Sequence, residues 1–245
     1  MDKRKLRLDE LGRKGYRILQ DPDAFCFGVD AVLLADFAEA KRTDRVLDLG
    51  AGNGIVPLLM DARDKGGEIV GLELQEDAAA LMEENFALNG TEERLRAARG
   101  DLKEASALFG KASFDAVVTN PPYQELGRGL VNPDSAKMIA RHEAACTLED
   151  VLREAAAVLK PGGRFCMVHR PKRLADILSG MEKAGIAPRT LRFVHSRARD
   201  AASMLLVSGV RGGGKDLKVL PPLILYGEDG KYTKEVYEIY YGDMT

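Results

Sequence analysis

The chain has 245 residues, 45% hydrophobic and 30% charged, with a net charge of −2, which is typical of one soluble globular domain with or without a small appendage. The near-neutral charge excludes a global basic field for nucleic acid, and no apolar run approaches the roughly 20 residues of a membrane span. Cys26, Cys146 and Cys166 are far apart in the sequence and do not have the spacing of metal ligands. The first residues are charged and no apolar segment follows them, so we expect no signal peptide. We therefore expect a cytoplasmic protein without a metal site.

The first forty residues predict short extended segments followed by a helix. Residues 16–20 and the Asp21-Pro22 turn favour extended structure, and from Asp30 the apolar spacing becomes helical. Asp30 is the expected N-cap, because its carboxylate can accept a hydrogen bond from the first helical turn. A helix that covers the sheet edge accounts for this spacing, but it leaves the Phe27-Gly28-x-Asp30 entry unexplained.

Residues 45–54 predict an apolar strand that runs into a glycine-rich turn, followed by a helix over about residues 55–63. Glycines at 50, 52 and 54 let the backbone approach a ligand closely. Their spacing is one residue short of the dinucleotide fingerprint. Asp48, just ahead of the turn, is awkward beside a pyrophosphate but suits a ligand with a cationic amine.

Two further strands are each followed by an acid. Residues 68–73 end at Glu73, and the strand over about residues 95–99 runs into Asp101. A carboxylate in the first position typically accepts ribose hydroxyls, and Asp101 could accept from an adenine amino group. Either acid alone is more often a solvated loop residue. Their position after successive strands of a βαβ series favours a nucleoside site instead.

The fourth strand of the series, residues 114–119, is stopped by two prolines, which hold Asn120 stiffly beyond its carboxyl end. Such a turn suits an exocyclic amine, a poor nucleophile because its lone pair is delocalised. The Asn120 side-chain oxygen and the Pro121 carbonyl would accept its two N–H bonds and aim the lone pair. Tyr123 would stack on a planar substrate, worth roughly 1–3 kcal/mol for a base. The alternative is a proline-rich turn without function.

Basic residues gather in the later loops. The loop over residues 124–133 contains Arg128 and is either a substrate lid or a surface loop. Further cations follow, and they suit phosphates or, alternatively, form an exposed charged rim: Arg141, His169, Arg170, Lys172 and Arg197. The tail, with a short aromatic helix, is expected to pack on the sheet.

Together these motifs resemble the class I S-adenosylmethionine-dependent methyltransferases over roughly residues 40–210. The resemblance rests on residues 48–54, Glu73, Asp101, 120–123 and 160–163, in the family's order. It implies an α/β, Rossmann-like fold, with a seven-stranded, mostly parallel sheet, helices on both faces and the last strand antiparallel. Residues 1–39 would cover the cofactor, and residues 40–245 would form the methyltransferase domain with a C-terminal extension, as one globular unit overall.

A closer similarity reaches the N-terminus and the tail. Gln20, residues 25–34, 53–59 and 120–123 resemble the tRNA adenine-N6 methyltransferases that act on valine tRNA, and His169-Arg170 and Tyr232-Thr233 fit the same pattern. That family modifies the adenine at tRNA position 37, next to the anticodon. The resemblance implies S-adenosylmethionine as the cofactor and a tRNA anticodon loop as the partner. We expect no metal, no membrane, and a monomer or a homodimer.

The resemblance assigns roles residue by residue. Asn120 and Pro121 would hold the target amine and Tyr123 would stack on the flipped base. The implied cofactor-binding residues are Asp48, Gly50 and Gly52 for the methionine part, Glu73 for the ribose, Asp101 for the adenine, Phe27, Gly28 and Asp30 as a cover, and also Asn53, Leu102 and Asn120. The implied RNA contacts are the six basic residues named above.

Other functions remain open. Release-factor glutamine-N5 methyltransferases share the Asn-Pro-Pro-Tyr motif, but they typically carry a helical domain ahead of the glycine turn, where only about 40 residues precede it here. Ribosomal RNA amino-methyltransferases remain an open alternative, and DNA adenine enzymes fit less well, because no target-recognition domain is visible. The glycine spacing and Asp48 argue against a nicotinamide-dependent oxidoreductase. A non-enzymatic RNA-binding or cofactor-sensing protein would not need Asn120.

Overall fold

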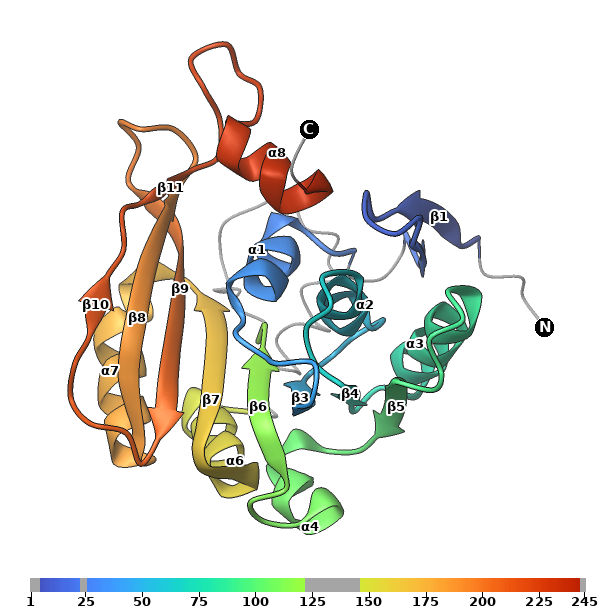
Figure 1. Cartoon of the computed structure of the whole chain (residues 1–245), viewed down its shortest axis with the longest axis vertical. Coiled ribbons are helices and arrows are strands. Elements are labelled where there is room, and N and C mark those ends of the chain that lie inside the picture. Colours follow the sequence, from blue (N-terminus) through green and yellow to red (C-terminus); the bar gives the residue numbers. More distant parts are fainter. Residues whose placement is uncertain (1–4, 23–25, 122–145, 243–245) are drawn as a thin grey trace.

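A computed structural model describes residues 5–22, 26–121 and 146–242 of the chain. Its centre is a mostly parallel sheet with the strand order β10-β8-β9-β7-β6-β3-β4-β5, and β11 also pairs with β8 (Figure 1). The strands are β3 (Arg45–Leu49), β4 (Glu68–Glu73), β5 (Leu95–Arg99), β6 (Phe114–Thr119), β7 (Leu159–His169), β8 (Ile186–His195), β9 (Ala202–Arg211), β10 (Lys218–Val219) and β11 (Leu223–Ile224).

Seven of these strands, β3 to β9, form the predicted sheet, and β9 is antiparallel to both of its neighbours, as expected. The prediction of seven strands falls short by two. The two-residue strands β10 and β11 of the C-terminal extension pair in parallel with the outer edge of β8. Segments this short give no strand signal of their own, because the exposed backbone groups of β8 determine where they pair.

Helices cover both faces of the sheet, as in a doubly wound fold. One face packs against α1 (Val29–Phe37), α2 (Ile55–Ala62), α3 (Glu76–Leu88) and α8 (Lys234–Tyr241). The other packs against α4 (Ala105–Phe109), α6 (Leu148–Val158) and α7 (Leu174–Lys183). Neighbouring strand residues alternate between the two cores: Val46 belongs to the first and Leu47 to the second. Both faces of the sheet are therefore apolar, as parallel sheets require.

The register of the parallel strands brings their carboxyl ends to one edge. Leu49 at the end of β3 pairs with Leu72 of β4 on one side and with Thr119 of β6 on the other. The Thr119 hydroxyl also donates to the Leu49 carbonyl at 2.8 Å, which fastens the two strand ends together. The turns that follow β3, β4, β5 and β6 consequently converge, and they carry the predicted site residues.

The N-terminal residues form a separate hairpin of β1 (Arg7–Glu10) and β2 (Arg17–Gln20), followed by α1 (Figure 1). The prediction of Asp30 as the N-cap of α1 is wrong, because extended Gly28 occupies that position and makes no side-chain cap. Asp30 lies in the first turn, where its Oδ1 accepts from the Ala31 N–H at 3.0 Å. Its second oxygen is thereby available for a contact outside the helix.

The C-terminal helix α8 is held by two arginines from distant parts of the chain. Arg13 donates to the Glu238 carbonyl at 2.6 Å, and buried Arg63 of the α2 C-cap donates to the Ile239 carbonyl at 2.6 Å. These carbonyls lie in the last turn of α8, where cations are favourable. The helix is therefore fixed to both the N-terminal hairpin and α2.

Buried Asn85 of α3 connects the hairpin to the glycine turn. Its Oδ1 accepts from the Leu19 N–H at 2.7 Å, and its Nδ2 donates to the carbonyls of Leu19 and Asn53, both at 3.0 Å. One side chain thus forms hydrogen bonds with three backbone groups of two separate segments.

Asn85→Ala is expected to lower the free energy of unfolding by about 2–4 kcal/mol, because it leaves buried backbone groups without partners. Asn89→Ala is the matched control. Asn89 makes a similar pair of bonds to Arg17, but at a partly exposed position where water can replace them. Its loss should cost about 1 kcal/mol or less. Urea denaturation of both variants measures the difference, and equal losses would contradict this role of Asn85.

Candidate active site

The glycine turn after β3 forms an open cradle. Gly50 and Gly52 have positive φ angles, 77° and 56°, and a Cβ atom at either position would meet no atom of the described residues within 4 Å. At Gly54, in contrast, a Cβ atom would lie 2.7 Å from Met82 and 2.8 Å from Phe86. Gly54 therefore serves packing, whereas the first two glycines leave backbone exposed to a ligand.

Asp48, at the end of β3, is the most unusual group of this edge. Its side chain is buried, with 1% exposure, and neither carboxylate oxygen has a hydrogen-bond partner among the described residues. Burial, assisted by the nearby charge of Glu73, raises the pKa of Asp48 to about 8. A buried carboxylate without a partner is costly. A ligand that brings an ammonium group would remove this cost, so the residue fits the amine of a bound amino acid.

Glu73 fastens the cradle to the next strand. Its Oε2 accepts from the Gly52 N–H at 3.0 Å and its Oε1 from the Gln75 N–H at 2.9 Å, with the side chain almost fully buried. A carboxylate oxygen can accept more than one hydrogen bond, so both oxygens can also receive hydroxyl groups. The position fits the predicted ribose contact.

Asp101 follows β5 and caps a single 3-10 turn, Leu102–Glu104. Its Oδ1 accepts from the Lys103 N–H at 2.9 Å, and its Oδ2 lies 3.4 Å from the Lys103 ammonium. The side chain is partly exposed, and Leu102 packs against the second core. Asp101 and Leu102 thus lie at the same sheet edge as Glu73, one strand further along.

Asn120 follows β6 and contacts the N-terminal helix. Its Nδ2 donates to Oδ2 of Asp30 at 3.1 Å. Because a carboxylate only accepts hydrogen bonds, this contact fixes the NH₂ side of the amide towards Asp30 and places the side-chain oxygen on the opposite side. The predicted cover and the predicted amine-binding residue therefore meet, although 90 positions separate them in the sequence.

The entry to α1 is held by the hairpin. The Phe27 N–H donates to Oε1 of Gln20 at 3.0 Å, and Gln20 in turn donates to Asp9. Gln20 is buried, with 1% exposure. The segment with Phe27 and Gly28 is therefore positioned by side chains of the hairpin rather than by helix propensity.

Three predicted site residues, Tyr123, Arg128 and Arg141, lie outside the described residues. At the carboxyl end of β7, His169 is largely buried and accepts from the Arg170 N–H at 2.8 Å. Burial and neighbouring cations lower the pKa of His169 to about 4, so it is neutral at physiological pH. Arg170 and Lys172 beside it, and Arg197 after β8, lie at the same sheet edge as Asn120.

Comparisons with known proteins agree with this geometry. Residues 15–184 match the family model of the methyltransferase small domain. A tRNA1(Val) (adenine(37)-N6)-methyltransferase of Bacteroides thetaiotaomicron is 34% identical, with 66% of this chain and 67% of the relative aligned. The chain belongs to the methyltransferase small-domain family.

Two other relatives that carry the same name differ in how much of their length is aligned with this chain. The protein of Tolumonas auensis is 33% identical, but the chain spans only 63% of its length, and that of Bacteroides fragilis is 26% identical over 95% of its length and 93% of this chain. The prediction of a methyltransferase is confirmed at the level of the family. The predicted cofactor, S-adenosylmethionine, agrees with that family and is bound in a solved methyltransferase structure of the same fold.

Solved structures confirm the predicted Rossmann-like fold. A predicted O-methyltransferase of Agrobacterium tumefaciens superposes with a TM-score of 0.71 at 23% identity, over 87% of this chain and 96% of the other. Geranyl diphosphate C-methyltransferase of Streptomyces coelicolor, solved with S-adenosyl-L-homocysteine, gives 0.51 at 16% identity, over 75% and 77%. In the described parts of the methyltransferase, no helix is long and apolar enough to cross a membrane. The same parts hold no cluster of metal-ligating side chains.

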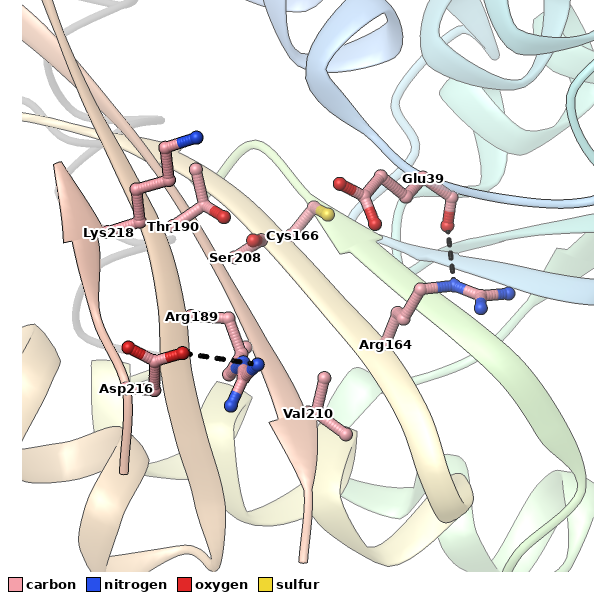
Figure 2. Close-up of a pocket in the computed structure, with 10 residues that line it drawn as sticks. Glu39, Arg164, Cys166, Arg189, Thr190, Ser208, Val210, Asp216 and Lys218 are labelled. Carbon is pink, nitrogen blue, oxygen red and sulfur yellow. Dashed lines mark hydrogen bonds and ion pairs between the residues drawn. The ribbon is translucent and has the colours of Figure 1, made fainter. Parts of the chain in front are cut away.

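A cavity lies elsewhere on the methyltransferase, over β7, β9, β8 and β10 (Figure 2). Small polar side chains of Cys166, Thr190 and Ser208 line its floor, and Arg164 and Arg189 lie at its sides, each bonded to a neighbour drawn with it. None of the predicted cofactor or amine-binding residues lines it. The candidate site is the open edge at the strand ends, not this cavity.

Two elements of the site were not predicted from the sequence, the Asp30–Asn120 hydrogen bond and the support of the turn by Asn85. A polar residue on the buried face of an otherwise amphipathic helix was the available signal for Asn85. Nothing local signals the Asp30–Asn120 contact, because it depends on where α1 packs.

Asp30→Ala is expected to lower kcat by about 10- to 100-fold, because the Asn120 amide loses the partner that orients it and small misplacements of reacting groups are costly. Binding of S-adenosylhomocysteine should change little. Asp30→Asn, which keeps an oxygen acceptor, should retain more activity. Steady-state kinetics with calorimetric titration of S-adenosylhomocysteine measures both quantities. Lost affinity with an unchanged kcat would contradict the orienting role and assign Asp30 to cofactor binding alone.

Proposed function

We propose that this methyltransferase transfers the methyl group of S-adenosylmethionine to the exocyclic N6 amine of an adenine in tRNA, at position 37 of valine tRNA. The observation that carries the proposal is the Asn120 amide, oriented by Asp30 at the strand edge that also holds the glycine cradle. The activity for which the relatives are named supports the choice of substrate.

Each group of proposed cofactor-binding residues would contact a different part of S-adenosylmethionine. Asp48 would pair with the ammonium of the methionine part, Gly50, Gly52 and Asn53 would line it, and Glu73 would accept the ribose hydroxyls. Asp101 and Leu102 would contact the adenine, and Phe27 and Gly28 would cover the ligand from the N-terminal side. The fit rests on the buried carboxylate of Asp48, which has no hydrogen-bond partner within the described parts of the chain, and on the backbone at the two glycines, which no described side chain covers. Bound S-adenosylmethionine supplies a methyl group activated by a positively charged sulfonium.

The chain's own residues would prepare the nucleophile. The Asn120 side-chain oxygen and the Pro121 carbonyl would accept the two N–H bonds of the target amine, which localises its lone pair and aims it at the methyl carbon. Asp30 holds the amide in this orientation. No strong general base is required before transfer, because the attacked carbon already carries a cationic leaving group. Tyr123 would stack on the target base.

An anticodon loop suits this site because its bases are already unpaired, so turning one outward costs little. Arg170, Lys172 and Arg197 at the same sheet edge would contact phosphates, together with Arg128, Arg141 and the less accessible His169. A tRNA substrate also fits the cytoplasmic location predicted from the cysteine pattern. Within this proposal, residues 1–39 act as the cofactor-covering segment and residues 40–245 as the catalytic domain, whether the protein is a monomer or a homodimer.

The proposal is tested with labelled S-adenosylmethionine and three substrates in parallel: undermodified total tRNA, ribosomal RNA and a release factor. Each product is digested and the labelled component identified. N6-methyladenosine from tRNA is the expected product. Label in glutamine, or only in ribosomal RNA, would replace the proposed substrate, and no label in any substrate would refute it.

A further inference from the structure

Three tyrosine rings of the C-terminal extension form a continuous stack. Tyr226 and Tyr232 have ring centroids 5.1 Å apart with an interplanar angle of 18°, and Tyr232 and Tyr240 are 5.4 Å apart at 20°. Tyr232 and Tyr240 pack against the first core, whereas Tyr226 is 36% exposed. The inner two rings therefore anchor the extension, and the outermost ring faces solvent.

The backbone places this outer ring at the same sheet edge as Asn120. β8 is parallel to β7, and β11 is parallel to β8, so Tyr226, two residues after β11, follows the carboxyl end of its strand. Its N–H donates to the Ser196 carbonyl at 2.9 Å, which joins it to the turn after β8. Figure 1 shows β11 and α8 at the end of the sheet towards which β6 points. Four strand spacings separate β11 from β6, about 20 Å.

The turn beside Tyr226 is positively charged. Arg197 and Arg199 are both exposed in the turn between β8 and β9, and the described part of the chain offers neither of them an ion pair. Asp200 in this turn contributes its backbone carbonyl to the His195 ring at 2.7 Å. The acids Glu228 and Asp229 lie instead in the hairpin tip beyond Tyr226. The cations thus lie on the β8–β9 side of the ring.

We propose that Tyr226 is a stacking platform for an unpaired base of the RNA substrate, and that Arg197 and Arg199 contact the phosphates next to that base. The inference rests on the proposed function and adds a second contact point to it, several nucleotides away from the target adenine. An exposed ring at the end of a preformed stack can receive a base without losing side-chain freedom. Adjacent guanidinium groups provide the charge that single-stranded nucleic acid requires.

Four variants test the platform through KM for tRNA, kcat, and the affinity for S-adenosylhomocysteine. Tyr226→Ala should raise KM for tRNA about tenfold, whereas Tyr226→Phe, which keeps the ring, should remain within about twofold of the wild type. Arg197→Gln combined with Arg199→Gln should also raise KM and make it less dependent on salt. Lys111→Gln is the charge control, because Lys111 is exposed at the amino end of β6, the opposite edge of the sheet. It should leave all values unchanged.

Unchanged KM values for both Tyr226→Ala and the double arginine variant would overturn the platform, while wild-type methylation of tRNA would still support the proposed function. A lowered Tm would show that Tyr226→Ala loosens the C-terminal extension. In that case the KM of the double arginine variant tests the platform, because Arg197 and Arg199 are exposed and substituting them should not disturb the core. A wild-type protein that methylates no RNA would overturn the proposed function and the platform together.

Discussion

Asn120→Ala is expected to lower kcat by about 100- to 1,000-fold and to leave the affinity for S-adenosylhomocysteine within about threefold of the wild type. The amide oxygen contributes by aligning the amine in the transition state, and removing one such preorganised polar contact typically has an effect of this size. Single-turnover kinetics with a saturating methyl donor isolates the chemical step. Turnover by Asn120→Ala at the wild-type rate would contradict the mechanism.

The Asp30–Asn120 contact allows a sharper test of the same residue. Asn120→Asp places two carboxylates together where an amide now donates to a carboxylate at 3.1 Å, so like charges would repel and one group would take up a proton. The activity of this variant should be low and should depend on pH. When Asp30→Asn is added to Asn120→Asp, the amide at position 30 can donate to the carboxylate at position 120, so the hydrogen bond is restored with donor and acceptor exchanged. The double variant should therefore be more active than Asn120→Asp alone, and failure to recover would argue against direct coupling of the two side chains.

Asp48→Asn is expected to reduce the affinity for S-adenosylmethionine by about 100-fold and to remove the rise in affinity between pH 6 and pH 8. The pKa of Asp48 is about 8 in the ligand-free protein, so this carboxyl group is mostly protonated at neutral pH. A cationic ligand binds its ionised form. Wild-type affinity should therefore rise with pH below pH 8, by up to about tenfold per unit, and stop rising near pH 8, where the ligand's α-amino group begins to lose its own proton. Calorimetric titrations between pH 6 and pH 9 measure this profile.

Asp48→Asn, which should weaken cofactor binding, should increase the stability of the ligand-free protein. The pKa of Asp48 is raised above its unfolded value of about 4, so the wild-type protein loses stability as pH rises from about 4 towards 8. Asp48→Asn removes this loss and should stabilise the ligand-free protein at pH 7 by an amount on the order of 4 kcal/mol. Exposed Glu149→Gln is the charge control and should change neither quantity. An Asp48→Asn variant that binds the cofactor normally would contradict the ammonium contact.

The strands and their terminal residues were largely predictable, because the signals are local. The runs that end at Leu49, Glu73 and Thr119 are apolar and are cut off by glycine, acid or proline, so each strand end coincides with a turn residue. Once the strands are parallel, their ends must meet at one edge. The positions of Asp48, Glu73, Asp101 and Asn120 along one edge therefore follow from the sequence and the fold class together.

Contacts that depend on packing between distant segments were not predictable. Asp30 looks like a helix cap in isolation, but its carboxylate accepts from Asn120, because the packing of α1 brings its first turn beside the residue that follows β6. Asn85 belongs to a helix whose sequence pattern predicts only that this face is buried. Its hydrogen bonds form because β2 and the glycine turn both pack beside it. The strands β10 and β11 form only because β8 presents an open edge.

The support of the site is concentrated in few side chains. Gln20 holds the entry to α1, Asn85 holds the glycine turn, and Glu73 joins that turn to β4. Each connects a backbone group of the candidate site to a different element. Changes in these residues should therefore alter cofactor affinity and stability together, unlike Asn120→Ala, which should alter turnover alone.

The central claim is tested most directly with a valine tRNA transcript and a second transcript in which adenine 37 is replaced by guanine. Both are incubated with the protein and S-adenosylmethionine, digested, and analysed by mass spectrometry. The account predicts one methyl group on the fragment that contains adenine 37, identified as N6-methyladenosine, and none on the substituted transcript. Equal methylation of the two transcripts, or a methyl group at any other atom, would contradict it.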